Sequence, residues 1–287
     1  MDCPMWRAIR VFFVGLAVAI AGVWLLSQPR NDRDWRADYA RQPQVARGAD
    51  APVLRNIRNW SYAPDGTPTA TPWIERALDP GALRQAWFVV EPFGPSPAIA
   101  HTMFAFEFED GAVFVASIEA RREVGESYSA VKAALLPIYE YIVVWTTERD
   151  MYANSEFVTG DQLFLYRLDI PLAHQRAILG AMIDRTEALQ TQPRWYNTLF
   201  ANCSNLLARV VNGLQAGAVP LHYSWILTGY ADSYLHRLGY IGLGEGFATT
   251  ERRAHISPLI PRAYGQTDPA AFSARLRALM DGRAVPG

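Results

Sequence analysis

Cys203 lies where a predicted helix begins. Residues 203–214 carry apolar side chains at helical spacing, and Asn202 just before them is a residue type that caps helix N-termini. Cys203 therefore lies in the first turn, where unpaired backbone N–H groups and the helix dipole stabilise a thiolate. A thiolate in that position is suited to attack a carbonyl carbon when a base and an orienting group lie nearby.

A histidine and a carboxylate occur on a predicted hairpin upstream. Residues 101–108 and 112–121 alternate apolar and polar side chains, and Glu109-Asp110-Gly111 joins them. Two registers fit this pattern: a two-residue Asp-Gly turn, and a three-residue loop that ends in a left-handed Gly111. We choose the second because it makes one face of the hairpin wholly apolar. It also places His101 directly across from Glu119 on the other face.

These three residues define a candidate thiol site. Cys203 is the predicted nucleophile, His101 the predicted base and Glu119 the predicted orienting group. Each residue also has a structural interpretation that stays open at this stage. The cysteine is then a small buried hydrophobe, the histidine the capped end of a strand, and the glutamate a salt-bridge partner of Arg121.

Four further residues are assigned to the oxyanion or substrate side. Backbone N–H groups near Cys203, with the side-chain amide of Asn202 or Asn197, are predicted to hold an oxyanion. Trp195 and Tyr196 are predicted to shape a substrate cleft, with core packing as the alternative. The other histidines are scattered and show no spacing such as His-Glu-x-x-His, so we expect no metal and no other cofactor.

The elements that must position these side chains follow an α+β pattern. We expect a central antiparallel sheet of about five strands, with the Cys203 helix packed on its His101 face. Helices are predicted near 127–136, after Pro171, and over 203–214, 224–238 and 269–280. Residues 244–267 are predicted to be irregular. Glu148-Arg149-Asp150 is predicted to be a turn, with a structural ion-pair network favoured over a substrate role.

Residues 11–26 form an uncharged apolar run at the N-terminal end. As a helix of about 24 Å it nearly spans the hydrocarbon core of a bilayer. We interpret it as an uncleaved signal anchor; the alternative is a signal peptide cleaved near Ala19-Ile20-Ala21, which lies inside the run. Arginines flank the run on both sides, so charge alone leaves the orientation open, and the short stub before it favours export of the rest.

The chain is divided accordingly into four parts. We expect a signal-anchor or transmembrane segment at 1–28, a polar linker at 29–52, an α+β domain at 53–245, and a C-terminal extension with one helix at 246–287. The chain has 27 basic and 28 acidic residues, a balance that lacks the basic footprint of a nucleic-acid-binding protein. Its two cysteines, Cys3 and Cys203, exclude a disulfide framework.

Several short motifs together resemble one protein family. They are Arg55-Asn56-Ile57-Arg58-Asn59, His101-Thr102-Met103-Phe104-Ala105-Phe106, Ser117-Ile118-Glu119-Ala120-Arg121, Glu148-Arg149-Asp150 and Trp195-Tyr196-Asn197-Thr198-Leu199-Phe200-Ala201-Asn202-Cys203. Over residues 53–245 the chain resembles the Lnb N-terminal periplasmic domain family, a bacterial, usually membrane-associated family whose activity is largely unassigned. The order of histidine before cysteine also resembles circularly permuted papain-like enzymes, such as the lecithin:retinol acyltransferase group and permuted NlpC-type hydrolases. Ser204-Asn205 departs mildly from the Thr-Thr that follows the cysteine in such family members.

The resemblance implies a permuted papain-like fold, with Cys203 as nucleophile, His101 as base and Glu119 as the third polar group. It implies a single-pass protein of the bacterial inner membrane with its soluble domain in the periplasm. The leading hypothesis is a membrane-tethered envelope thiol hydrolase or acyltransferase that acts on an amide or ester of a peptidoglycan peptide, a lipid or a lipoprotein. The main alternative is a non-catalytic periplasmic accessory domain of the same fold, and a metal hydrolase is a distant third.

Overall fold

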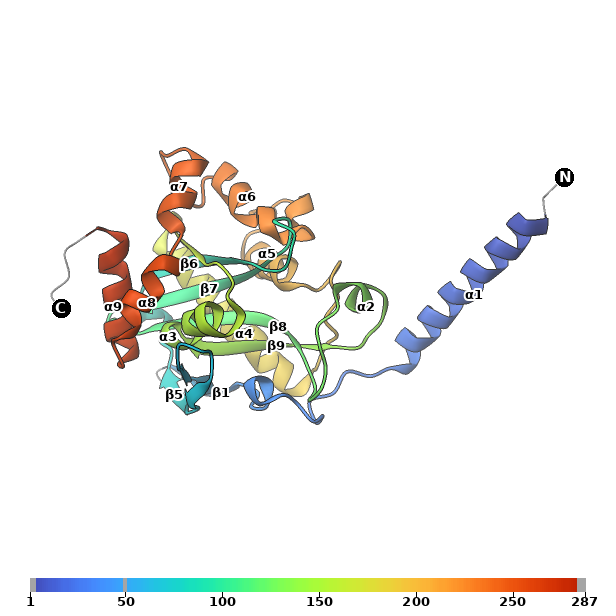
Figure 1. Cartoon of the computed structure of the whole chain (residues 1–287), viewed down its shortest axis with the longest axis horizontal. Coiled ribbons are helices and arrows are strands. Elements are labelled where there is room, and N and C mark those ends of the chain that lie inside the picture. The colour runs from blue at the N-terminus through green and yellow to red at the C-terminus, as the bar shows by residue number, and fades with distance from the viewer. Residues whose placement is uncertain (1–3, 49–50, 283–287) are drawn as a thin grey trace.

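The N-terminal helix projects away from the rest of the protein. The computed structural model describes residues 4–48 and 51–282, so Cys3 lies outside the described residues. Helix α1 (Pro4–Leu26) contains the predicted apolar run and is long and apolar enough to cross a membrane. Figure 1 shows it extending from the folded body, with the short helix α2 (Ala130–Leu135) as the element nearest its end. The Trp24 indole Nε1 donates a hydrogen bond to the Leu135 carbonyl at 2.9 Å.

A mixed sheet forms the centre of the body, which confirms the predicted α+β class. Within the described residues the sheet has eight strands in the order β1-β2-β9-β8-β7-β6-β10, with β5 paired to β2. The strands are β1 (Gln44–Arg47), β2 (Pro52–Arg58), β5 (Trp73–Ala77), β6 (Leu83–Pro92), β7 (Ala100–Phe108), β8 (Val113–Arg121), β9 (Glu140–Thr147) and β10 (Phe164–Arg167). A separate ribbon pairs β3 (Ser61–Tyr62) with β4 (Pro68–Ala70). The sheet is larger than the five strands expected, and the β2–β9 pair is parallel.

The β7–β8 hairpin adopts the register chosen from the sequence. Phe106 pairs with Phe114 and Phe104 with Ala116, and the Phe108 N–H donates to the Ala112 carbonyl at 2.9 Å. Gly111 closes the three-residue loop at a φ of +83°, a left-handed conformation that glycine adopts at little cost. The hairpin prediction is confirmed because loop chemistry and the apolar face select the same register.

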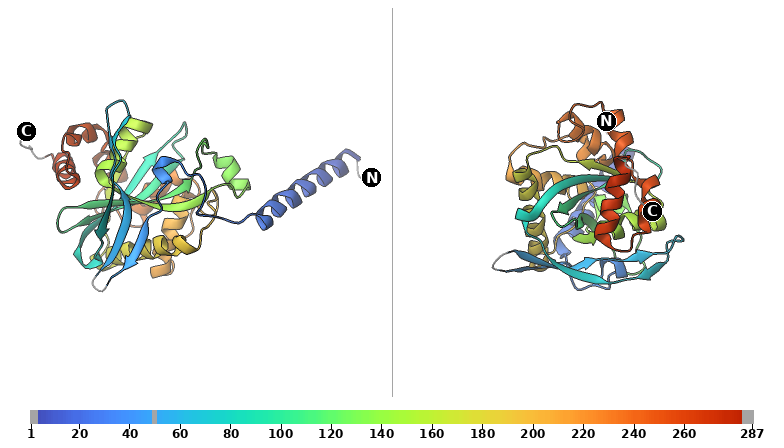
Figure 2. Two further views of the ribbon diagram at one scale, coloured as in Figure 1. Left: turned by 90° about the horizontal axis from the view of Figure 1, so that it is seen from below. Right: turned by 90° about the vertical axis from the view of Figure 1, so that its left-hand side faces the viewer.

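Helices cover both faces of the sheet (Figure 2). The face with Phe104 and Phe106 packs against α4 (Leu172–Thr191) and α5 (Cys203–Leu214). The face with Met103 and Ala105 packs against α3 (Glu148–Ala153), α8 (Ile260–Tyr264) and α9 (Pro269–Met280). The expectation that α5 packs on the His101 face is therefore wrong, because alternation along β7 directs His101 to the Met103 side. The large phenylalanine side chains supply the apolar surface that the stripe of α5 buries.

Three local predictions differ from the structure. The helix expected over 224–238 is broken into η4 (Tyr223–Trp225), η5 (Thr228–Tyr230) and α6 (Ala231–Arg237). A Cβ at Gly229 would lie 1.9 Å from the Pro97 carbonyl oxygen, so only glycine lets this segment approach the loop before β7 so closely. Residues 244–267, expected to be irregular, contain α7 (Phe247–Ala254), η6 (Ser257–Leu259) and α8. The turn expected at residues 148–150 instead opens α3, which continues into the π-helix η3 (Asn154–Thr159).

The segment expected to be a polar linker lies against the body. Trp35 and Tyr39 are buried, the latter in the one-turn helix η1 (Ala37–Tyr39). The Arg121 guanidinium lies 4.3 Å from the centre of the Trp35 ring and donates to the Tyr39 carbonyl at 2.8 Å. These contacts fix the path of the chain from α1 to the sheet, because a buried arginine needs the acceptors that this segment supplies.

Candidate active site

Helix α5 begins where the sequence predicts, and Asn202 is its cap. The Asn202 Oδ1 accepts a hydrogen bond from the Asn205 N–H at 2.8 Å. Its Nδ2 donates to the carbonyls of Thr198 and Trp225, both at 2.8 Å. Asn202 thereby ties the start of the helix to two loops. Because both amide hydrogens are engaged, the Asn202 side chain holds the N-terminus of α5 in place. The cap occupies the Asn205 N–H and leaves those of Cys203 and Ser204 as the first-turn donors for an anion.

Cys203 occupies the first position of α5 and is 4% exposed. Its Sγ lies 4.0 Å from the Ala100 carbonyl oxygen at the start of β7. The next residue, Ser204, shares a hydrogen bond with the Thr102 hydroxyl, with 2.9 Å between the two oxygens. The start of α5 is thereby fixed to the start of β7, which carries the predicted base.

His101 and Glu119 face each other across β7 and β8. The His101 Nε2 lies 2.9 Å from Glu119 Oε1 and 2.5 Å from Ser117 Oγ. Ser117 in turn donates to Glu119 Oε1 at 2.5 Å, so its hydroxyl accepts from Nε2–H. With Nε2 occupied by these oxygens, Nδ1 is the ring nitrogen left for the Cys203 thiol. This sets the tautomer and the direction in which a proton can move.

The thiol and imidazole shift each other's proton affinity. Burial by itself raises the pKa of Cys203, but the charge of His101 and hydrogen bonds with His101 and Thr102 outweigh it and hold the pKa below its ordinary value. Burial likewise tends to lower the pKa of His101, yet the charges of Glu119 and Cys203 raise it well above its ordinary value. Opposite shifts of this kind favour the thiolate–imidazolium pair over the neutral thiol–imidazole pair.

Glu119 is an ionised carboxylate held by the histidine. Burial tends to raise its pKa, but the charge and hydrogen bond of His101 and the Ser117 hydroxyl lower it to about 2. The salt bridge to Arg121 considered from the sequence is not formed, since that guanidinium binds the Tyr39 carbonyl. Arg149 is also engaged elsewhere, donating to the Gln266 carbonyl and the Ser61 hydroxyl, both at 2.8 Å. The carboxylate is therefore directed at His101.

The other predicted residues are placed differently from one another. Tyr196 is buried beside Cys203, and the thiolate together with burial raises the phenol pKa well above its ordinary value. Asn197 donates both Nδ2 hydrogens to the carbonyls of Ala133 and Ala134 at 3.0 Å, which ties this loop to α2. The Arg33 guanidinium lies over the Trp195 ring, 5.7 Å from its centre, and Trp195 lines a cleft with Arg185, Arg194 and Arg209.

Two polar residues near His101, Ser117 and Glu91, were not predicted from the sequence as members of the site. Ser117 links His101 to Glu119, and its place on the polar side of the hairpin was the available signal. Glu91 pairs directly with His101 on the neighbouring strand β6. Burial raises the pKa of Glu91 to about 7, opposed by the charge of His101. A long proline-rich loop joins β6 to β7. The register of this strand pair, and with it the position of Glu91, therefore could not be predicted from the sequence.

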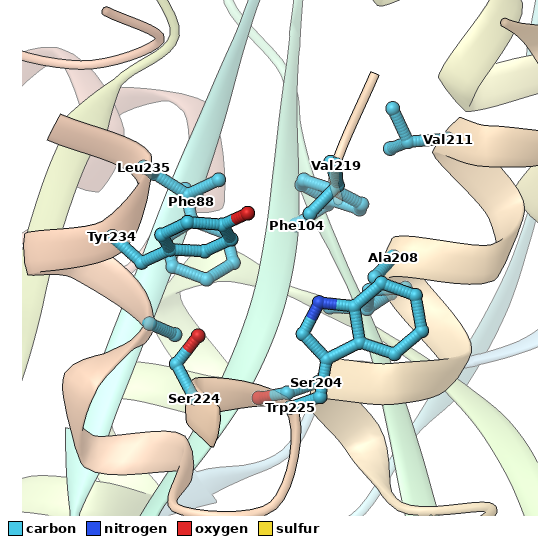
Figure 3. A pocket seen from close by; sticks show the side chains of 12 residues that line it. Phe88, Phe104, Ser204, Ala208, Val211, Val219, Ser224, Trp225, Tyr234 and Leu235 are labelled. Carbon is cyan, nitrogen blue, oxygen red and sulfur yellow. The ribbon is translucent and has the colours of Figure 1, made fainter. Parts of the chain in front are cut away.

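An apolar cavity of about 50 Å³ lies behind the start of α5. Side chains of β6, β7, α5 and α6 surround it, and Ser204 contributes to its wall (Figure 3). Phe88, Phe104 and Tyr234 provide aromatic surface, with Trp225 at one side. Ser204 follows Cys203 directly in the chain, but Cys203 itself does not line this cavity.

Removal of the Asn202 cap is expected to lower stability and to disturb the thiol together. Asn202→Ala should cost about 1 kcal/mol or somewhat more, because an N-cap and two loop contacts are lost. Asp268→Ala removes the matching cap of α9, where Oδ1 accepts from the Ala271 N–H at 2.8 Å. The melting temperature should decrease in both variants, whereas the rate of Cys203 alkylation should change only in Asn202→Ala. If Asn202→Ala and Asp268→Ala changed the alkylation rate equally, the Asn202 cap would have no specific role at the thiol.

Comparison with models of protein families identifies one family that matches this chain. The family model described as Lnb N-terminal periplasmic domain matches residues 70–228, a segment that contains Cys203, His101 and Glu119. Neither the curated proteins nor the solved structures include a significant match. The resemblance to papain-like enzymes therefore stays a prediction.

Proposed function

The chain belongs to the Lnb N-terminal periplasmic domain family, and on that premise we propose that it is a membrane-tethered envelope thiol hydrolase or acyltransferase. The observation that carries this proposal is the His101–Glu119 pair at 2.9 Å, next to a helix-start thiol whose pKa the charge of His101 lowers. A partly buried carboxylate that orients a histidine beside a helix-start cysteine is the arrangement expected of an acyl-transfer nucleophile.

The proposed reaction proceeds through a thioester. The Cys203 thiolate attacks the carbonyl carbon of an amide or ester, and the N–H groups at the start of α5 stabilise the oxyanion. The carbonyl re-forms as the bond to the leaving nitrogen or oxygen breaks, and the His101 imidazolium gives that atom a proton. Neutral His101 then deprotonates water or an acceptor amine or hydroxyl, which attacks the thioester and releases the Cys203 thiolate, so the thiolate–imidazolium pair is restored. Glu119 stabilises the imidazolium in both states.

Trapping of the acyl-enzyme tests this function. The full chain and Cys203→Ser are incubated with envelope extract, and the peptide that contains residue 203 is analysed by mass spectrometry. Wild-type protein should carry an adduct that neutral hydroxylamine removes, and the serine variant a hydroxylamine-resistant ester. The adduct mass distinguishes a peptidoglycan peptide from a lipid or lipoprotein acyl group. An unmodified Cys203 that also alkylates like an ordinary thiol would support the accessory-domain alternative.

Glu119→Gln is expected to leave a reduced but measurable activity. The substitution keeps the shape of the side chain and removes the charge that raises the pKa of His101, so the imidazolium is less stable. Alkylation of Cys203 at pH 7 should slow several-fold, and the chain should stay folded. Glu123→Gln is the matched control, because that carboxylate pairs with Arg33 outside the site. A lower melting temperature with an unchanged thiol pH profile would make Glu119 a structural residue only.

The low pKa of Glu119 also predicts an acid-stability effect. Its pKa is about 2 in the folded protein, below the ordinary glutamate value of about 4.3. Its contribution is therefore fully present above pH 4.3 and is lost as the pH falls toward 2. Wild-type protein should lose stability across that interval more steeply than Glu119→Gln, as measured by chemical unfolding at successive pH values.

We also propose that α1 is retained and that the body faces the periplasm. The family and the apolar length of α1 support this placement. Alkaline phosphatase fused after Gly287 should be active, and the chain should remain with membranes after a carbonate wash. An inactive fusion would reverse the orientation. Release of the chain into the soluble fraction would identify α1 as a cleaved signal sequence.

A further inference from the structure

Exposed apolar side chains gather on three segments beside the thiol site. We call them the apolar rim; they are Val131 and Leu135 of α2, Leu199 and Phe200 just before α5, and Leu221 and Ile226 around η4. Phe200 is 66% exposed, although it lies only three positions before Cys203. A cluster of exposed large apolar residues on three segments is unusual for a surface that faces only water.

Hydrogen bonds join the three segments into one surface. The Thr198 hydroxyl donates to the Ala130 carbonyl at 2.8 Å, which connects α2 to the loop with Phe200. Asn202 connects that loop to the η4 segment through the Trp225 carbonyl. The three segments are therefore neighbours, and the middle one is the loop that leads directly into Cys203.

The rim begins where the membrane-spanning helix ends. The Trp24 indole in the last turn of α1 donates to the carbonyl of Leu135, a rim residue. Figures 1 and 2 both show α2 at the end of the body that faces α1, with α9 at the opposite end. A bilayer that contains α1 is consequently the surface closest to the rim. Tryptophan is also a side chain that favours the membrane interface.

Positive charge borders the same loop. A cleft of about 380 Å³ is lined by Arg185, Arg194 and Arg209, together with Pro29 at the end of the anchor and Ala201 beside the rim. Arg185 donates to the Tyr141 hydroxyl at 3.2 Å and Arg194 to Gln192 Oε1 at 3.4 Å, which are neutral acceptors. Within the described residues these arginines therefore keep their charge uncompensated. Anionic headgroups provide the complementary charge.

We propose that this face docks on the bilayer that holds α1. The apolar rim enters the interfacial layer, the three arginines bind headgroup phosphates, and the start of α5 lies at the lipid surface. The proposal rests on the retention of α1 proposed above and is independent of the thiol chemistry. It assigns the rim a partner that is a lipid surface rather than a second protein.

Photo-crosslinking in the full chain tests the docking. Benzoylphenylalanine replaces Phe200, Ile226 or Val158 in protein reconstituted into vesicles of phosphatidylcholine with phosphatidylglycerol. Val158 is the matched control because it is 47% exposed, against 43% for Ile226, and it lies on η3 at the end of the body that contains α8. Lipid adducts should be at least fivefold more abundant at 200 and 226 than at 158. Equal yields at all three positions, or adducts mainly to a second copy of the chain, would overturn the proposal.

The arginines are tested by lipid composition. Substitution of Arg185, Arg194 and Arg209 by glutamine should lower the yield at position 200 in vesicles with phosphatidylglycerol and leave it unchanged in phosphatidylcholine alone. Competition by millimolar inorganic phosphate in wild-type protein would instead assign the cleft to a free anion. Cys203→Ala should give the wild-type pattern, so a failure of the thiol chemistry and a failure of docking produce different results.

Discussion

His101→Ala is expected to slow the alkylation of Cys203 at pH 7 by up to about thirtyfold. The charge and hydrogen bond of His101 keep the thiol pKa below its ordinary value. An ordinary thiol with a pKa of about 8.5 is only about 3% ionised at pH 7, so loss of the histidine returns most of the protein to the unreactive thiol. Iodoacetamide labelling followed by peptide mass spectrometry measures the rate at Cys203, with the Cys3 peptide as an internal reference.

The pH dependence of the alkylation rate provides a second test of the Cys203–His101 pair. In wild-type protein the rate should fall less than in His101→Ala as the pH drops from 8 to 7, because the lowered thiol pKa keeps a larger fraction of Cys203 as thiolate. In His101→Ala it should fall about eightfold across that unit, as for an ordinary thiol with a pKa of about 8.5. His174→Ala is the matched control, since His174 lies on the exposed side of α4. Identical profiles for all three proteins would contradict the assigned pair.

Asp150→Ala is expected to cause the largest loss of stability. Asp150 is fully buried and accepts from Arg58 Nε at 2.9 Å, from the Trp60 N–H at 2.8 Å and from the Tyr62 hydroxyl at 3.0 Å. Removal of the carboxylate leaves the buried Arg58 cation without a counter-charge, at a cost of about 3–5 kcal/mol. The melting temperature should fall by about 10 °C in a chain of this size.

Arg47→Gln provides the matched control for this prediction. Arg47 pairs with Asp184 and Glu187 at the surface, with 48% of its side chain exposed. Exposed ion pairs contribute about 0–1 kcal/mol to the free energy of unfolding, so the melting temperature should change by only about 2 °C. If Asp150→Ala lost no more stability than Arg47→Gln, the buried pair would not be a main support of the fold. Glu148 likewise pairs with Arg277 at 2.7 Å, which agrees with the structural interpretation of this motif.

Interactions within a few residues of sequence were predicted correctly. The Asn202 cap and the apolar stripe define α5 at its observed bounds, and α9 spans the predicted residues 269–280 with Asp268 as its cap. Gly111 and the alternating hairpin define the register that brings His101 opposite Glu119. These features depend on local hydrogen bonds and on the period of side chains along a strand, which are both visible in the sequence.

Contacts between distant segments were decided by the tertiary structure. Gly229 breaks a predicted helix only because the loop at Pro97 packs against it. Glu91 lies opposite His101 because β6 pairs with β7, and Trp195 contacts Arg33 of the segment that follows α1. The sequence contains no periodic signal for such pairings, because they arise from how whole elements pack.

The sequence by itself determined which residues carry reactive groups and where on their own elements those groups lie: a thiol at a helix start, and an imidazole opposite a carboxylate on a hairpin. Only the tertiary structure decided that α5 packs on the phenylalanine face while its first residue still reaches His101. Large apolar side chains set the face, and the bond between Thr102 and Ser204 fixes the end of the helix at the end of the strand. That meeting joins residues about a hundred positions apart, and burial of apolar surface across the whole sheet, rather than any local preference, provides its driving force.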